Sequence, residues 1–317
     1  MQQKIYFPDP NLRRVVDNWL QYLYFRATRP SFCLRNYETE IAVHVNNVPG
    51  TRHKRLRNVC EPSPLMAYTN SYKEPEATLL PGYFGPDPYD INWAFPLNEE
   101  ALESERVKLT PFVPSLHARE YAAQVTAHPD LHQWYPFSLT SLDEILTEVE
   151  LRARRTPTNI LFAIIDKARD NALAGVVALL DTSAFNLSVE IGWLVVFPAF
   201  QRTYVTSNAV GILLRYALEL PDPDTGRGGM GFRRVQWTAH AANLPSHAVA
   251  RRMGMQEECV VRWSMVMPSG AVGNGIAVRD GDPMSGRAGR DSIIFSLCAD
   301  DWEKGGRSDV VDVIKRK

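Results

Sequence analysis

The order of strand-like and helix-like apolar patterns after residue 103 constrains the fold more than any other feature. Alternating or continuous apolar runs predict strands at residues 106–112, 159–166, 173–181, 189–196, 232–240, 257–267 and 291–298. Apolar residues at helical spacing predict helices at residues 114–127, 142–155, 206–220, 245–253 and 308–317. Because strands and helices do not alternate regularly, this order favours an α+β fold with a mixed sheet over a doubly wound parallel sheet.

The first hundred residues differ in composition, which predicts a separate N-terminal extension. Half of the 22 prolines occur there, and proline interrupts both helices and sheets. A helix is expected at residues 11–27, a strand at 39–45, and an aromatic-rich wrap over the main domain at 81–97. We therefore divide the chain into an extension, residues 1–100, and a main domain, residues 101–317.

The composition argues against several classes of protein. The formal net charge of -1 gives no general attraction to nucleic acid or to an acidic membrane surface. The four cysteines form no CxxC pair, so neither a metal site nor a dense disulfide framework is expected. The N-terminus lacks the apolar core of a signal peptide, and the apolar runs fall short of the roughly 20 residues of a membrane helix. We expect a cytoplasmic protein with reduced thiols and no nucleic-acid or membrane partner.

Four segments, at residues 189–202, 203–219, 232–255 and 290–303, resemble the Gcn5-related N-acetyltransferase (GNAT) superfamily in order and spacing. The local sequences are most similar to its RimJ/RimL-type branch, which acetylates protein N-terminal amines and related small amines. The resemblance covers roughly residues 103–302. It implies a mixed, mostly antiparallel central sheet flanked by helices, and acetyl transfer from acetyl-CoA to an amine.

In this family, a loop with the pattern Q/R-x-x-G-x-G/A presents backbone amides to the diphosphate of coenzyme A, at the N-terminus of a helix. The residues that match this loop are Gln201, Arg202, Thr203, Tyr204, Val205, Thr206 and Ser207. Both small positions are changed, to Tyr204 and Thr206, and larger side chains restrict the approach of a ligand to the backbone. The alternative is an ordinary helix start capped by Thr206 or Ser207.

The strand at 189–196 carries two further implied functions. In the family this strand separates from its neighbour after a β-bulge, and its backbone binds the pantetheine arm and stabilises the oxyanion. The resemblance places Leu194, Val195 and Val196 in this role. Glu190, earlier in the strand, matches a general base, which burial would favour by raising its pKa. The alternative for Glu190 is a carboxylate that faces solvent at the strand edge.

The stretch that begins at Asn243 matches the family's remaining functional positions. Asn243 is implied to bind the pantetheine amides, and Ser246 to assist the departing thiolate. Either residue could instead only cap the following helix. His240, at the end of the preceding strand, is a second candidate base, with a structural role as its alternative. His247 is expected to face outward.

The acceptor pocket is expected beside the first two helices of the main domain. Trp134, Tyr135 and Phe137 form a candidate aromatic wall, although core packing is expected for at least one of them. The extension's aromatic residues are expected across the same opening, which would favour a small-molecule amine over a protein N-terminus. These residues are Tyr83, Phe84, Tyr89 and Trp93.

Two other functions are compatible with the sequence. The first is a GNAT-fold enzyme that no longer uses coenzyme A and performs acid–base chemistry such as cyclisation, isomerisation or decarboxylation. The changed positions Tyr204 and Thr206 favour this alternative. The second is a binding module without catalytic activity, in which the N-terminal extension fills the cleft.

Overall fold

The computed structural model describes residues 71–72, 81–225 and 228–316. The helix and strand expected at residues 11–27 and 39–45 lie outside this part of the chain. All elements described below belong to the compact unit Ala77–Lys317. The division at residue 100 stays a prediction.

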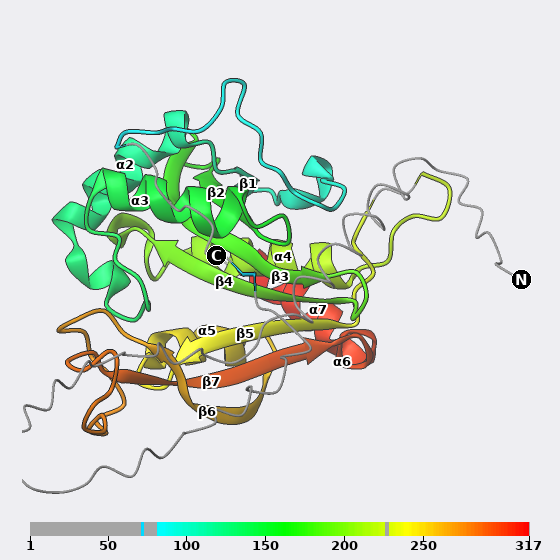
Figure 1. Cartoon of the computed structure of the whole chain (residues 1–317). Coiled ribbons are helices and arrows are strands. Elements are labelled where there is room, and N and C mark those ends of the chain that lie inside the picture. The colour runs from blue at the N-terminus through cyan, green and yellow to red at the C-terminus, as the bar shows by residue number, and fades with distance from the viewer. Residues whose placement is uncertain (1–70, 73–80, 226–227, 317) are drawn as a thin grey trace, which may run out of the picture. The chain divides into compact units, whose positions relative to one another are not determined.

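A seven-stranded sheet forms the centre of this unit, with strand order β1-β2-β3-β4-β5-β7-β6 (Figure 1). The strands are β1 Val107–Pro111, β2 Ile160–Asp166, β3 Ala172–Ser183, β4 Ser188–Val196, β5 Arg234–His240, β6 Gln256–Val266 and β7 Gly289–Cys298. Every neighbouring pair is antiparallel except β4 and β5, which run parallel. The mixed, mostly antiparallel sheet implied by the sequence resemblance is therefore confirmed.

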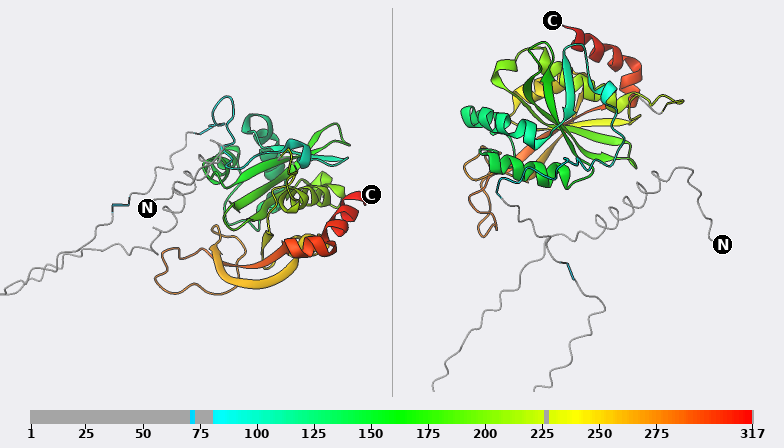
Figure 2. Two further views of the ribbon diagram at one scale, coloured as in Figure 1. Left: turned by 90° about the vertical axis from the view of Figure 1, so that its right-hand side faces the viewer. Right: turned by 90° about the horizontal axis from the view of Figure 1, so that it is seen from above.

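Helices cover both faces of the sheet. They are α2 Pro114–Ala127, α3 Leu142–Val149, α4 Tyr204–Leu218, α5 Leu244–Arg252, α6 Ala299–Asp301 and α7 Arg307–Lys315. Short 3-10 or π turns are η1 Glu99–Leu102, η2 Pro129–His132, η3 Glu150–Arg154, η4 Pro198–Phe200 and η5 Trp302–Gly306. The first core joins one face to α4, α5 and α7, and the second joins the opposite face to α2 and α3 (Figure 2). No helix within the described residues has the length and apolar character needed to cross a membrane.

The aromatic segment at 81–97 packs against this domain without forming a helix or strand. Trp93, Phe95 and Leu97 contact the first core, and the Tyr216 hydroxyl of α4 donates to the Pro96 carbonyl over 2.8 Å. Phe84 contacts the second core on the opposite face. The segment therefore contributes apolar surface to both cores.

Candidate active site

The two central strands separate part of the way along the sheet. Residues Ser188–Glu190 of β4 pair with Arg234–Gln236 of β5, and the pairing ends there. Beyond Glu190, β4 stays paired with β3 on its other side, while β5 continues to His240 paired with β7. The edge of β4 that faces β5 thus keeps backbone groups without a strand partner, along a cleft of about 1910 Å³.

A β-bulge lies in the open part of β4. Val189 and Ile191 face the first core, whereas Trp193 and Val195 face the second, so the alternation of side chains shifts between them. Trp193 has a φ of 45°, a conformation that is uncommon for a bulky residue. The register between β3 and β4 shifts at the same place. The bulge turns the β4 backbone just where the strands part.

Buried hydrogen bonds hold Trp193 in this conformation. Its indole N–H donates to the Tyr121 hydroxyl over 3.2 Å, and that hydroxyl lies 2.7 Å from His132 Nε2. Burial lowers the pKa of His132 to about 4, so the imidazole is neutral and accepts the tyrosine proton. The bulge is therefore fixed by side chains from α2 and η2.

The first turn of α4 reaches one end of the cleft. Thr203 caps the helix, because its Oγ1 accepts the Val205 amide over 3.3 Å and donates to the Phe200 carbonyl over 2.6 Å. The alternative cap at Thr206 or Ser207 is therefore wrong, since the helix begins two residues earlier than expected. Thr206 and Ser207 line the cleft instead, in the first turn of the helix, where most amides lack a backbone acceptor.

Tyr204 does not close this end of the cleft. Its hydroxyl donates to Asp166 at the end of β2, at 2.8 and 3.0 Å from the two carboxylate oxygens. The Arg106 guanidinium lies 4.1 Å from the centre of its ring. The phenol is thus held toward β1 and β2, and the cleft extends to Thr206 and Ser207 despite the larger residues at the small positions.

The same end of the cleft is rich in arginine. Arg202 has a φ of 59° and is exposed, and Gln201 donates its side-chain amide to the Val196 carbonyl over 2.9 Å. The arginines that line the cleft near α4 and α5 are Arg169, Arg202, Arg252 and Arg316. Together with the helix N-terminus, they form a region of positive potential suited to a phosphate group.

Glu190 lies at the point where the strands separate. Its Oε2 accepts hydrogen bonds from Thr238 Oγ1 (2.8 Å) and Gln236 Nε2 (2.9 Å), both on β5. Burial raises the pKa of the Glu190 carboxyl above its ordinary value, although these two hydrogen bonds act in the opposite direction. Glu190 lines the cleft, so the solvent-facing alternative does not describe it.

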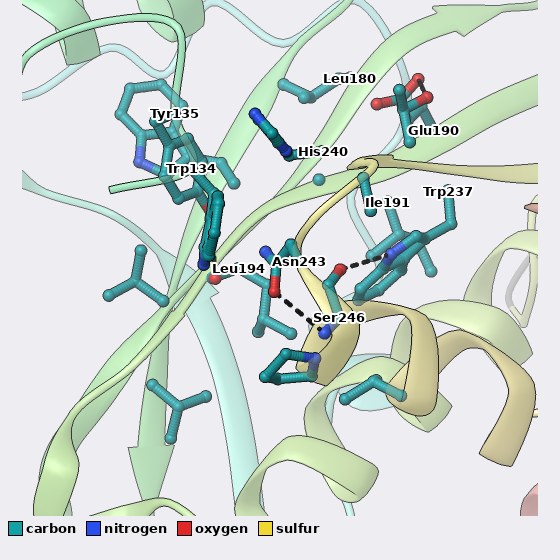
Figure 3. Close-up of a pocket in the computed structure, with 18 of the residues that line it drawn as sticks. Trp134, Tyr135, Leu180, Glu190, Ile191, Leu194, Trp237, His240, Asn243 and Ser246 are labelled. Carbon is teal, nitrogen blue, oxygen red and sulfur yellow. Dashed lines mark hydrogen bonds between the residues drawn. The ribbon is translucent and has the colours of Figure 1, made fainter. Parts of the chain in front are cut away.

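Asn243 and Ser246 lie at the start of α5 and line the cleft (Figure 3). Asn243 Oδ1 accepts the Ser246 amide over 3.2 Å, which makes Asn243 the N-cap. Ser246 Oγ accepts the Trp237 indole N–H over 2.9 Å. That hydroxyl keeps its own proton for donation, and the Asn243 amide nitrogen has no hydrogen bond within the described residues. The capping role and a ligand-binding role are therefore compatible.

His240 is held in one tautomer. Its Nδ1 accepts the Ala242 amide over 3.0 Å, so the ring proton is on Nε2, which lies 3.3 Å from the Val272 carbonyl. Burial lowers the pKa of His240, and the nearby positive charge of Arg290 lowers it further. The neutral ring therefore has no free lone pair, a geometry that favours the structural alternative over a base.

His247 does not face outward, as the sequence analysis expected. It is buried, with Nε2 3.0 Å from the His240 carbonyl and its ring 5.5 Å from Phe295. The expectation was wrong because position 247 shares a helix face with Ala250, which is also buried.

The aromatic wall lies at the other end of the cleft, and Trp134, Tyr135 and Phe137 all line it. Tyr135 donates its hydroxyl to the Leu194 carbonyl over 3.0 Å, and the Phe137 ring lies 5.2 Å from that of Trp193. Tyr135 and Phe137 also pack against the second core, which accounts for the expected core role.

The extension's aromatic residues do not cover the cleft, which corrects the expectation. None of Tyr83, Phe84, Tyr89 and Trp93 lines it. Trp93 packs beside Phe95, with ring centres 4.9 Å apart. The guanidinium of Arg119, on α2, lies 5.2 Å from the centre of the Phe84 ring. Burial against the cores thus takes these rings away from the opening.

Comparison with known proteins finds one matching family model and solved structures with a similar fold. Residues 106–256 match the family model of the acetyltransferase (GNAT) domain. A GCN5-related N-acetyltransferase from Brucella melitensis is 23% identical, over 67% of this chain and 84% of that one, with a TM-score of 0.52. A probable acetyltransferase of the GNAT family from Chromobacterium violaceum is 23% identical, over 74% and 100%, with a TM-score of 0.53. Mycobacterium smegmatis RimJ in complex with CoA-disulfide is 17% identical, over 65% and 88%, with a TM-score of 0.48.

No curated protein matches the chain. Residues 106–256 therefore carry a GNAT domain, as the sequence resemblance implied, and the solved structures share its fold. The matched region thus has the fold of this class of acetyltransferase domains.

Several cleft residues were not identified from the sequence. Gln236 and Thr238 alternate with Trp237 in the strand, so the pattern could have placed them on one face toward Glu190. No comparable signal indicated that Trp237 would contact Ser246. None indicated that Arg290 would line the cleft. Arg290 lies at the start of a strand far away in sequence.

Proposed function

We propose that the chain is an acetyl-CoA-dependent N-acetyltransferase that acts on a small-molecule amine. The observation that carries this proposal is the parting of β4 and β5 beyond Glu190, which leaves β4 backbone along a cleft that reaches the first turn of α4. An extended, polar arm that ends in a diphosphate matches both parts of this cleft.

The residues present fit coenzyme A. The β4 backbone at Leu194, Val195 and Val196 and the side-chain amide of Asn243 would hold the pantetheine arm. The backbone amides of β4 are the groups on offer, because the Leu194 and Val196 carbonyls already accept from Tyr135 and Gln201. The backbone amides of Arg202, Thr203, Tyr204 and Thr206 would hold the diphosphate, with the hydroxyls of Thr203, Thr206 and Ser207 nearby. The amides of Gln201 and Val205 already donate to the Pro198 carbonyl and to Thr203 Oγ1. This fit rests on the cleft beside Thr206 and Ser207, which the tethered Tyr204 leaves accessible. Acetyl-CoA would supply a thioester whose acetyl group is open to attack by an amine.

Glu190 is the proposed general base. Most amines are protonated at neutral pH, so the acceptor must lose a proton before it attacks. Glu190 Oε2 is occupied by Thr238 and Gln236, and no hydrogen bond holds Oε1 within the described residues. The raised pKa increases the carboxylate's proton affinity. Glu190 therefore accepts the amine proton, directly or through one water.

Two groups stabilise charge in the proposed reaction. A backbone amide near Val195 donates to the carbonyl oxygen as negative charge develops on it. Ser246 donates its hydroxyl to the departing sulfur, while the Trp237 indole holds the oxygen in place. The chemistry depends on proximity and on fixed donors, with no covalent enzyme intermediate.

Support for a small acceptor comes from the aromatic end of the cleft. Trp134, Tyr135 and Phe137 offer ring surface to one compact apolar group. The alternative without coenzyme A rests on Tyr204 and Thr206, and the accessible helix turn beside them weakens it.

Thermal unfolding with and without acetyl-CoA tests the proposal. A ligand at 100 times its dissociation constant stabilises the native state by about 2.7 kcal/mol, so the midpoint should rise. Thiol release with an amine panel then reports transfer. An unchanged midpoint at millimolar coenzyme, without thiol release, would favour the two alternatives.

Ser246→Ala separates catalysis from binding, with the exposed Ser308→Ala as its matched control. Loss of one hydrogen bond to the leaving sulfur should lower kcat about tenfold and leave coenzyme affinity unchanged. Equal kcat values for the two variants would remove Ser246 from the mechanism.

A further inference from the structure

Arg290 is a buried cation on the acceptor side of the cleft. It is the second residue of β7, only 6% of its surface is exposed, and it lines the cleft. Among the described residues, no carboxylate lies within ion-pair distance of its guanidinium. A buried charge without a partner is costly, so this arrangement needs an explanation.

The hydrogen bonds of Arg290 fix its position and leave donors free. Nε donates to Ser292 Oγ over 3.1 Å, and Nη1 donates to the Trp134 carbonyl over 3.2 Å. A guanidinium has five N–H groups in a planar fork, so most of them stay available. Because Arg290 binds the backbone of Trp134, these donors lie beside the aromatic wall.

The other charges on this side of the cleft are already engaged or negative. Arg152 forms an ion pair with Glu148 and lies over the Phe137 ring at 4.5 Å. Asp181 and Glu190 are acids. Arg290 is therefore the cleft cation here that lacks an acidic partner among the described residues.

Glu190 and Arg290 are close enough to affect each other but do not touch. Each shifts the pKa of the other toward its charged form, and no ion pair joins them. A carboxylate and a guanidinium that lie apart in one cleft complement a ligand that carries both an ammonium group and an anionic group. The guanidinium fork matches a carboxylate in particular, through two parallel hydrogen bonds.

We propose that the acceptor is an amino carboxylate with an apolar or aromatic side chain, and that Arg290 binds its carboxylate. The inference rests on the proposed function and deepens it. The amine lies toward Glu190, the carboxylate on Arg290 and the side chain against Trp134, Tyr135 and Phe137. A peptide N-terminus lacks a carboxylate beside its amine and is a poor acceptor in this arrangement.

Initial rates of thiol release with matched amines test the specificity. The pairs are phenylalanine with phenethylamine and tyrosine with tyramine, with phenylalaninamide as a neutral analogue and O-phosphoethanolamine as a phosphate-bearing amine. The full chain should prefer the carboxylates by at least about 100-fold in kcat/KM. Arg290→Gln should raise the KM for the amino acid, so that kcat/KM becomes nearly equal for the amino acid and for the matched amine without a carboxylate. The KM for acetyl-CoA should stay unchanged. Arg290→Lys should retain part of the preference, and the exposed Arg279→Lys all of it.

A binding measurement makes the inference independent of turnover. Calorimetric titration of 3-phenylpropanoate, a carboxylate without an amine, should give binding to the full chain and at least about tenfold weaker binding to Arg290→Gln and to Arg290→Lys. Equal rates for paired amines, a preference for O-phosphoethanolamine or phenylalaninamide, or equal binding by all variants would overturn the inference. Failure of the proposed function gives a different result, namely no stabilisation by acetyl-CoA and no thiol release with any amine.

Discussion

Glu190→Gln should separate the activity of this protein from its stability. The substitution keeps the shape of the side chain, and the new amide oxygen can still accept from Thr238 and Gln236. Glutamine cannot accept a proton from the amine. Loss of a general base typically lowers the rate by about 100- to 10,000-fold, or about 3–5 kcal/mol in the barrier.

Stability should change in the opposite direction. Burial raises the folded-state pKa of Glu190, so the folded protein binds a proton more tightly than the unfolded chain does. The resulting stability is complete below the unfolded-state pKa and is lost as pH rises through the folded-state pKa. Above the folded-state pKa the ionised, buried carboxylate opposes folding, so in that pH range Glu190→Gln should raise the free energy of unfolding.

The assays are pH profiles of kcat/KM and denaturant titrations of unfolding. In the unmodified chain, activity should rise with pH across the raised pKa of Glu190, above the ordinary range of a carboxyl group. The variant should lose this acid limb. Glu257→Gln is the matched control, because Glu257 is an exposed β6 residue paired with Arg251. Near-normal activity in Glu190→Gln, or an unchanged acid limb, would refute the assignment of the base.

Three further substitutions test the geometry around the cleft. Tyr204→Phe removes the hydrogen bond to Asp166, so urea titration should show a loss of about 1–3 kcal/mol in the free energy of unfolding. Calorimetry should show unchanged CoA affinity, and weaker CoA binding would contradict the placement of the phenol. Gly175→Ala would put a methyl 2.0 Å from the Val195 carbonyl, so β4 must move, and we expect at least about a tenfold loss of kcat/KM; full activity would speak against the bulge as a functional element. His240→Asn should leave the acid limb of the pH profile in place, since both ring nitrogens are already hydrogen bonded; loss of that limb would make His240 the base.

The sequence predicted the elements of the main domain well because their apolar patterns are long and regular. Each of the seven strands begins and ends within three residues of its expected bounds. The pattern did not predict burial equally well. Val260 and Trp263 of β6 have the apolar residues of a buried strand but are 54% and 45% exposed.

The site was predicted only in part, for physical reasons. Short-range patterns placed Asn243 and Ser246 at a helix start, and the family resemblance indicated Glu190. The left-handed conformation of Trp193 could not be predicted, because tryptophan has no preference for it and the buried Tyr121 and His132 side chains, distant in sequence, hold it. Arg290 reaches the cleft only through the pairing of β7 with β5, which joins residues more than 50 positions apart.

Amide hydrogen exchange with and without coenzyme A tests the central claim most directly, because the claim concerns backbone N–H groups. Binding should slow exchange in residues 191–196 of β4 and residues 204–207 of α4, and leave β1 unchanged. Protection confined to other parts of the chain, or no protection at saturating coenzyme A, would contradict the proposed site.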